Sequence, residues 1–108
     1  MKKEFKSFKK KIILNNNMKV NLPKNIIFEH IKEEGFLFNE ETEKIFEVNG
    51  TGVFIINLIL KGVEDKREII NEITNEYEVE KEVASQGFDE FIKKLKELNL
   101  ILINNDLY

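Results

Sequence analysis

Residues 44–62 read KIFEVNGTGVFIINLILKG, and the apolar pattern changes its period within this stretch. The first five residues include the β-branched and aromatic side chains that are typical of strands. The second half is apolar almost all round as far as Leu60, which is typical of a buried helix. Asn49 or Thr51 can cap this helix at its start, and Gly62 is placed to end it. The stretch therefore predicts a strand that turns directly into a central helix.

Two more strands are predicted before this stretch. Ile26 to Ile31 is rich in β-branched and aromatic residues, and Phe36 to Phe38 forms a shorter second strand. Gly35 is expected in the turn between them. A polar turn over residues 39–42 then leads into the strand at Lys44–Val48, so the second and third strands are predicted to form a hairpin with a loop of about four or five residues.

Two amphipathic helices are predicted after the central helix. Asp65 and Glu68 have the spacing of a capping box, and a second helix is expected to run to about Tyr77. A third helix is expected from about residue 80 to residue 98. Its apolar stripe consists of Ala84, Phe88, Phe91, Ile92, Leu95 and Leu98.

Two details complete this order of elements. Gly87 lies inside the third helix, where glycine costs about 1 kcal/mol relative to alanine, and it would permit a close backbone approach. The apolar tail from Leu100 to Ile103 is a candidate for a final strand. The predicted order is three strands, three helices and this tail.

Charge is distributed unevenly along the chain. Residues 1–22 hold seven lysines and one acid, whereas residues 23–108 hold ten basic and nineteen acidic residues. Pro23 is the only proline, and it stands where the composition changes. We therefore expect a basic arm over residues 1–24 and a folded domain over residues 25–108.

The arm has three interpretations. It is a solvated tail, it packs on its own acidic body, or it meets an acidic partner. Phe8 to Leu14 is a candidate strand within it, and Asn15 to Asn17 is expected to form a turn or loop.

The composition disfavours several classes of protein. There are no cysteines, which removes disulfides and thiolate chemistry and suits a reducing cytoplasm. No apolar run approaches the ~18 residues that a membrane-spanning helix needs. His30 is the single histidine, and Gly50-Thr51-Gly52 lacks the spacing of a phosphate-binding loop. No catalytic residue, metal site or cofactor is predicted.

Four loose motifs follow one another over residues 26–103. They are Val48-Asn49-Gly50-Thr51-Gly52 after a hairpin, Lys61-Gly62 after the apolar helix, Glu68-Ile69-Ile70 with Ile73 and Tyr77, and Phe91-Ile92-Lys93-Lys94-Leu95 followed by Asn99-Leu100-Ile101. In this order and spacing they resemble the PqqD-like family, whose members are peptide chaperones, or precursor-recognition elements, of ribosomally made and modified peptides.

The chain departs from the family pattern at two positions. Gly87 stands before Phe88, where the family often has an acid, so any contact made by that acid is in doubt. Asn99 replaces the usual glycine, and asparagine also tolerates the left-handed conformation. The arm lies outside the resemblance.

The resemblance implies an α+β winged helix-turn-helix fold, in which a three-stranded antiparallel sheet is followed by three helices. It also implies that the leader segment of a precursor peptide binds as an added strand and is presented to a maturation enzyme, such as a radical SAM enzyme or a leader peptidase. A sheet edge offers unpaired N–H and C=O groups for this purpose. The expected peptide-binding residues are Lys44, Ile45, Phe46, Glu47 and Val48 on the edge strand and Phe88, Phe91, Ile92 and Leu95 on the third helix.

Other interpretations remain open. For the four residues of the third helix, the alternative is that they are simply core. For the whole chain, one alternative is a protein–protein adaptor or a homodimer that uses the central helix. Another is DNA binding, which the acidic domain disfavours because a DNA reader needs a basic face.

Overall fold

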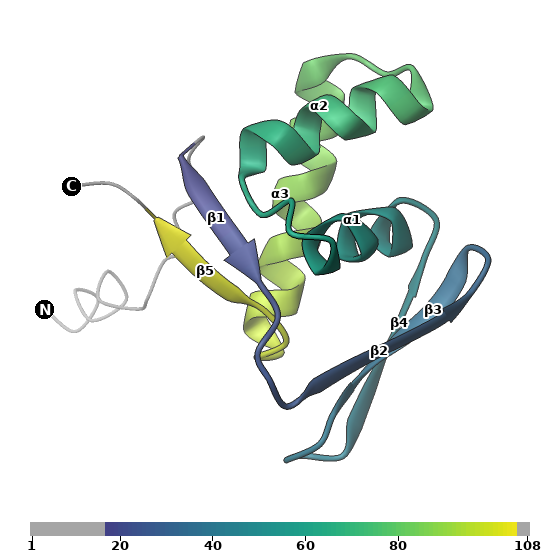
Figure 1. Ribbon diagram of the computed structural model, residues 1–108, viewed down its shortest axis with the longest axis vertical. Helices are drawn as coiled ribbons and strands as arrows, with labels where there is room; N and C mark the ends of the chain where they lie inside the picture. The colour runs from purple at the N-terminus through teal and green to yellow at the C-terminus, as the bar shows by residue number, and fades with distance from the viewer. Residues whose placement is uncertain (1–16, 106–108) are drawn as a thin grey trace, which may run out of the picture.

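In the computed structural model, which describes residues 17–105, a meander of three antiparallel strands leads into three helices (Figure 1). This confirms the predicted α+β architecture. The elements are β1 (Met18–Asn21), β2 (Ile26–Ile31), β3 (Glu34–Asn39), β4 (Lys44–Asn49), α1 (Thr51–Leu60), α2 (Lys66–Tyr77), α3 (Lys81–Glu97) and β5 (Leu102–Asn105). The sheet order is β2-β3-β4, and β1 and β5 pair separately. Figure 1 shows the β1–β5 pair on one side of the helices and the three-stranded sheet on the other.

The turn between β2 and β3 differs from the prediction. Ile31 pairs with Glu34, so the turn consists of the two residues between them, and Lys32 takes a positive φ of 56°. Gly35 lies within β3, opposite His30. A Cβ at Gly35 would lie 2.6 Å from both the Cβ of His30 and the carbonyl oxygen of Glu29. Glycine is thus needed here for a close approach of the two strands.

The loop between β3 and β4 depends on a buried asparagine at the end of β3. The Oδ1 atom of Asn39 accepts hydrogen bonds from the backbone N–H groups of Glu41 at 2.9 Å and Thr42 at 3.2 Å. It also accepts one from the side chain of Asn25 at 3.1 Å. A buried amide oxygen is stable only when it is hydrogen-bonded in this way. Asn39 therefore joins the four-residue loop to the start of β2.

Helix α1 begins directly after β4. Its N-cap is Gly50, which has φ 52° and makes no side-chain cap, so the predicted caps Asn49 and Thr51 are wrong. Glycine adopts this conformation without the strain that a Cβ would add. The helix ends before Gly62, which has φ 99°. Four of its residues form the centre of the core: Val53, Ile55, Ile56 and Ile59.

An ion pair between a buried lysine and a half-buried aspartate joins α2 to α3. The side chain of Asp65 caps α2 by accepting from the N–H of Arg67 at 2.8 Å. In the next position Lys66 is buried, and its Nζ lies 2.9 Å from Oδ1 of Asp89 and 6.0 Å from the ring centre of Phe88. The ammonium thus has both a counter-charge and an aromatic face.

After α3 the chain turns through Asn99, whose φ of 58° matches the left-handed conformation expected there. The tail then forms β5, which pairs antiparallel with β1. Met18 and Val20 of β1 are buried, so the predicted arm overlaps the fold at its C-terminal end. The candidate strand Phe8–Leu14 lies outside the described residues.

Gly87 in α3 does not serve a close backbone approach, because a Cβ there would have no neighbour within 4 Å. We expect Gly87→Ala to raise the free energy of unfolding by about 1 kcal/mol, since alanine favours the helix without a clash. Gly52→Ala is the matched control. Its Cβ would lie 3.1 Å from the ring of Phe91, so this variant is expected to lose stability. Urea unfolding measures both, and a less stable Gly87→Ala would contradict the open environment of this position.

Candidate functional site

Strand β4 forms one edge of the three-stranded sheet, and its backbone groups alternate between the sheet and the outside. In an antiparallel pair, only every second pair of facing residues is joined by hydrogen bonds. The N–H of Gly50 donates to the carbonyl of Glu33 at 2.9 Å, and this bond sets the alternation. Counting back in steps of two, Val48 and Phe46 are bonded to β3. The N–H and C=O groups of Ile45, Glu47 and Asn49 therefore point away from the sheet.

The bond between the N–H of Glu40 and the carbonyl of Asn25, at 2.9 Å, agrees with this assignment. Glu40 thus directs its backbone to the β2 side. Because the direction repeats at every second residue, Phe38 and Phe36 of β3 also direct their backbone groups to β2. They face Glu47 and Ile45 of β4, which therefore have no backbone partner on that side.

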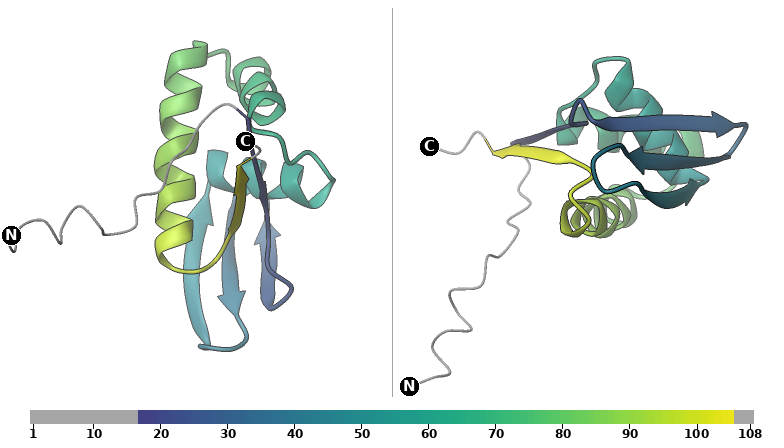
Figure 2. Two further views of the ribbon diagram at one scale, coloured as in Figure 1. Left: turned by 90° about the vertical axis from the view of Figure 1, so that its left-hand side faces the viewer. Right: turned by 90° about the horizontal axis from the view of Figure 1, so that it is seen from below.

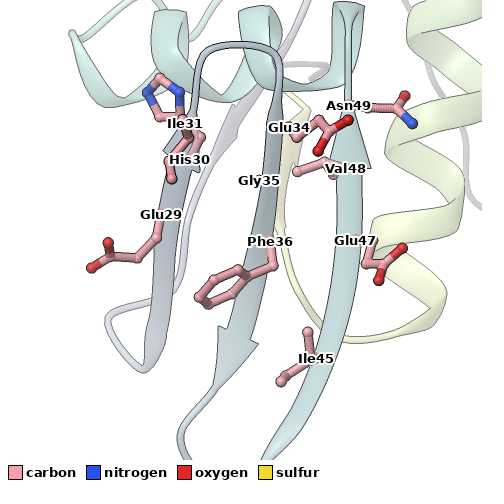
Figure 3. Close-up of a pocket in the computed structure, with 10 residues that line it drawn as sticks. All are labelled: Glu29, His30, Ile31, Glu34, Gly35, Phe36, Ile45, Glu47, Val48 and Asn49. Carbon is pink, nitrogen blue, oxygen red and sulfur yellow. The ribbon is translucent and has the colours of Figure 1, made fainter.

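The five predicted residues of β4 thus have two different roles. Lys44, Phe46 and Val48 direct their backbone to β3, and the side chains of Phe46 and Val48 pack on the core. Ile45 and Glu47 are exposed and direct their backbone outward. Figure 3 shows the side chains of Glu47 and Asn49 on the side of β4 where α3 lies. Of the five predicted residues, only Ile45 and Glu47 therefore offer backbone N–H and C=O groups at the open edge of the sheet.

Three of the four predicted residues of α3 do not lie at a surface. Phe88, Ile92 and Leu95 have exposed fractions of 1%, 0% and 0%, so their side chains lie in the core, which is the alternative that the sequence left open for them. The physical reason is that residues of β1, α1 and α2 pack in the same core cluster as these three side chains and cover them. Their contact with a bound peptide stays a prediction. Phe91 alone is half-buried and remains available.

Phe91 identifies the side of α3 that borders the start of α1. Its ring lies 3.1 Å from the position that a Cβ of Gly52 would occupy. Residues three, four and seven positions apart share one side of a helix, so Lys94 and Leu98 lie on the same side as Phe91. Leu98, the last residue of the predicted apolar stripe, is 44% exposed. We name the open backbone of β4 and this side of α3 the β4–α3 site.

Two further residues of this side, Val83 and Gly87, were not predicted as binding residues. They precede Phe91 by two turns and one turn of the helix, and Val83 is exposed. Val83 is apolar and exposed, and helical spacing places it and Gly87 on the same side of α3 as Phe91. This spacing is the signal in the sequence that could have identified both residues.

His30 is held by local contacts at the surface of the sheet. Its Nδ1 lies 3.0 Å from the carbonyl oxygen of Lys32, to which it donates. Its Nε2 then accepts from the side chain of Asn57 at 3.4 Å, and its ring stacks on Phe28. Both ring nitrogens are thus used in structural contacts.

The described residues offer neither a metal-binding cluster nor a membrane-spanning helix. Within residues 17–105, no group of three or more histidine, cysteine or acidic side chains is arranged to hold a metal ion. None of the helices described there has the length and apolar character needed to span a bilayer.

Comparisons with known proteins agree on the fold. The sequence model of the family described as coenzyme PQQ synthesis protein D (PqqD) matches residues 34–101. A solved structure of TbiB1 in complex with the TbiA(beta) leader peptide is 23% identical, with a TM-score of 0.70, covering 75% of this chain and 93% of that one. A lasso peptide synthetase B1 complexed with the leader peptide is also 23% identical, with a TM-score of 0.68, covering 77% and 96%. At this identity the two structures show a shared fold. No protein of curated function matches the sequence.

The difference between core and surface residues of α3 can be tested by alanine substitution. Phe88→Ala is expected to cost about 3–5 kcal/mol of unfolding free energy, because it leaves a cavity in the core. Leu98→Ala is expected to cost less than about 1 kcal/mol, because much of its side chain already meets water. Urea unfolding of both variants measures these costs. Equal losses would mean that Leu98 is a core residue and is not part of the β4–α3 site.

Proposed function

The chain belongs to the PqqD family, and on this premise we propose that it binds the leader segment of a ribosomally made precursor peptide and presents it to a partner modification enzyme. The observation that carries the proposal is the outward backbone of Ile45, Glu47 and Asn49 on β4. A leader in extended conformation pairs with these groups and adds a fourth strand to the sheet.

Backbone pairing supplies only part of the binding free energy. Each hydrogen bond contributes about 0.5–1.5 kcal/mol net, and backbone groups are the same in every peptide. Selectivity therefore comes from side chains beside the edge. Phe91 and Leu98 offer apolar contact area on α3, and Lys94 between them offers a positive charge. In this proposal a matching leader carries apolar residues on the side that faces α3.

The protein acts in this proposal as a binding module and leaves the chemistry to its partner. That partner is a maturation enzyme such as a radical SAM enzyme or a leader peptidase. The complex forms in the cytoplasm, where precursor peptides are synthesised. The module works as a single chain or as a homodimer.

DNA binding is an alternative function, because winged-helix folds also occur in DNA-binding proteins. The charges of α2 disfavour it. As the helix in the recognition position, α2 would have to contact phosphates with Lys66 and Arg67. Lys66 is buried and paired with Asp89. That leaves Arg67 on a helix that also carries three acids, Glu68, Glu72 and Glu76. Phosphate binding needs an exposed positive surface.

The first test is direct binding. Leader peptides of precursors encoded beside this chain are titrated into the full-length protein by calorimetry. We expect a one-to-one complex with a dissociation constant in the micromolar range or tighter, and no change in the covalent structure of the peptide when the partner enzyme is left out. The absence of heat with every leader at high micromolar concentration would exclude the proposal.

The second test separates backbone from side chain. Glu47→Pro and Ile45→Pro each remove an N–H that points outward, so they spare the bonds to β3. Loss of one such bond is expected to weaken leader binding about two- to twelvefold, the equivalent of about 0.5–1.5 kcal/mol. Thermal melting checks that the variants stay folded.

Two controls accompany these variants. Glu47→Gln keeps the N–H and is expected to bind the leader much as the parent does. Phe46→Pro removes an N–H that bonds to β3 and is expected to destabilise the sheet itself. Folded Ile45→Pro and Glu47→Pro variants with unchanged affinity would show that the leader does not pair with β4.

A further inference from the structure

The outer face of the three-stranded sheet, turned away from the helices, has an apolar centre (Figure 3). The register places Ile27, Phe38 and Ile45 in one row across the strands, with Phe36 in the next row. Ile45 is 63% exposed, and Ile31 at the end of β2 is 79% exposed. The sheet's solvent face normally carries polar side chains, and contiguous exposed apolar residues mark interaction surfaces.

This face is also hollowed and acidic. A hollow of about 540 Å³ lies over it, and its apolar lining includes Ile31, Phe36 and Ile45. Glu29 and Glu47 flank Phe36 in the same cross-strand row, and Glu34 lies beside them. No lysine or arginine is among the residues that line the hollow. A complementary partner must therefore bring positive charge together with apolar side chains.

The complementary chemistry is present in residues 1–16 of this chain, which lie outside the described part. They contain six lysines and one acid. Five apolar side chains are interspersed with these lysines: Phe5, Phe8, Ile12, Ile13 and Leu14. Packing of the outer faces of two copies against each other is disfavoured, because it would bring Glu29, Glu34 and Glu47 of both copies together.

The geometry favours the segment of another copy over that of the same copy. Strand β1, which follows residues 1–16, lies on the far side of the helices from the three-stranded sheet (Figures 1 and 2). Phe8 precedes Asn17 by nine residues, which span at most about 30 Å when fully extended. Strand β1 also starts at its end away from the three-stranded sheet (Figure 1), so the segment of the same copy would have to double back past β1 and the helices to reach the outer face.

We propose that the outer face of the β2–β3–β4 sheet is a docking surface for residues 1–16 of a second copy of this chain. Lysines of that segment meet Glu29, Glu34 and Glu47, and its aromatic and aliphatic residues fill the hollow over Phe36 and Ile45. This contact uses side chains on the face of the sheet and leaves the outward backbone of β4 free. Leader binding and this self-association therefore do not exclude each other, and the inference stands independently of the leader.

The test uses a spin label on the full-length chain. Ser7→Cys introduces a single cysteine into a protein that has none, so a nitroxide can be attached there alone. The labelled protein, without isotope enrichment, is mixed with ¹⁵N-enriched parent protein, and loss of amide signal then reports contacts between copies only. We expect losses at Glu29, Ile31 and Phe36. We also expect the losses to diminish at high salt, because part of the contact is electrostatic.

Variants locate the contact on the enriched copy. Phe36→Thr and Ile31→Thr keep residues that favour strands but remove apolar area, and Glu29→Gln removes one charge. Each is expected to reduce the signal loss. Leu60→Thr is the matched control, because it removes an exposed apolar side chain from α1 and is expected to change nothing. Thermal melting and the amide spectrum confirm that each variant is folded.

Three outcomes would overturn the proposal. Signal loss centred on Phe91 and Leu98 would mean that the segment occupies the β4–α3 site. Signal loss that appears only when label and isotope are on the same molecule would mean that the segment contacts its own chain. No loss anywhere would leave the outer face to a different protein.

Discussion

The arrangement of the whole domain depends on the burial of the apolar side chains of helix α1 by the elements around it. Its side chains are apolar in nearly every direction, so a single packing surface cannot remove them from water. Burying one isoleucine or valine side chain contributes about 1.5–3 kcal/mol, and α1 buries four of them. The sheet covers one side of this helix, while α2, α3 and β1 supply the other surfaces of the same core. The edge of β4 and the outer face of the sheet do not pack on α1 and stay open to solvent.

The alternation of a strand connects these two open surfaces. In β4 the residues whose backbone points to the edge are also the residues whose side chains lie on the outer face. Ile45 and Glu47 therefore contribute N–H groups to one surface and side chains to the other. A substitution that preserves the N–H affects only the outer face, whereas proline affects the edge as well. At Ile45 and Glu47, the effect of the backbone on the edge is therefore separable from the effect of the side chain on the outer face.

The ion pair of the buried Lys66 with the half-buried Asp89 shows that packing can remove a charge from the exposed surface. Lysine is seldom buried without a partner, because removing its ammonium from water is costly. Here the pair joins the first turn of α2 to the middle of α3, and the ammonium also faces the ring of Phe88. The exposed surface of α2 is therefore more acidic than its sequence suggests. A charge count along the chain cannot include this effect.

The sequence by itself determined much of the local structure, because local structure depends on contacts between near neighbours. The β2–β3 turn and the cap of α1 are the local features that it did not determine. The bounds of β2, the cap at Asp65 and the left-handed Asn99 followed from side-chain shape and hydrogen bonding within a few residues. The same local patterns, in their order, indicated the family. The tertiary structure decided which residues of each pattern reach the surface. Helical spacing placed Phe88 and Phe91 on one stripe, but only the position of α1 and its Gly52 made one of them core and the other half-exposed. The pairing of β1 with β5 and the outward backbone of β4 depend on registers between separate segments of the chain, and a register exists only once those segments meet.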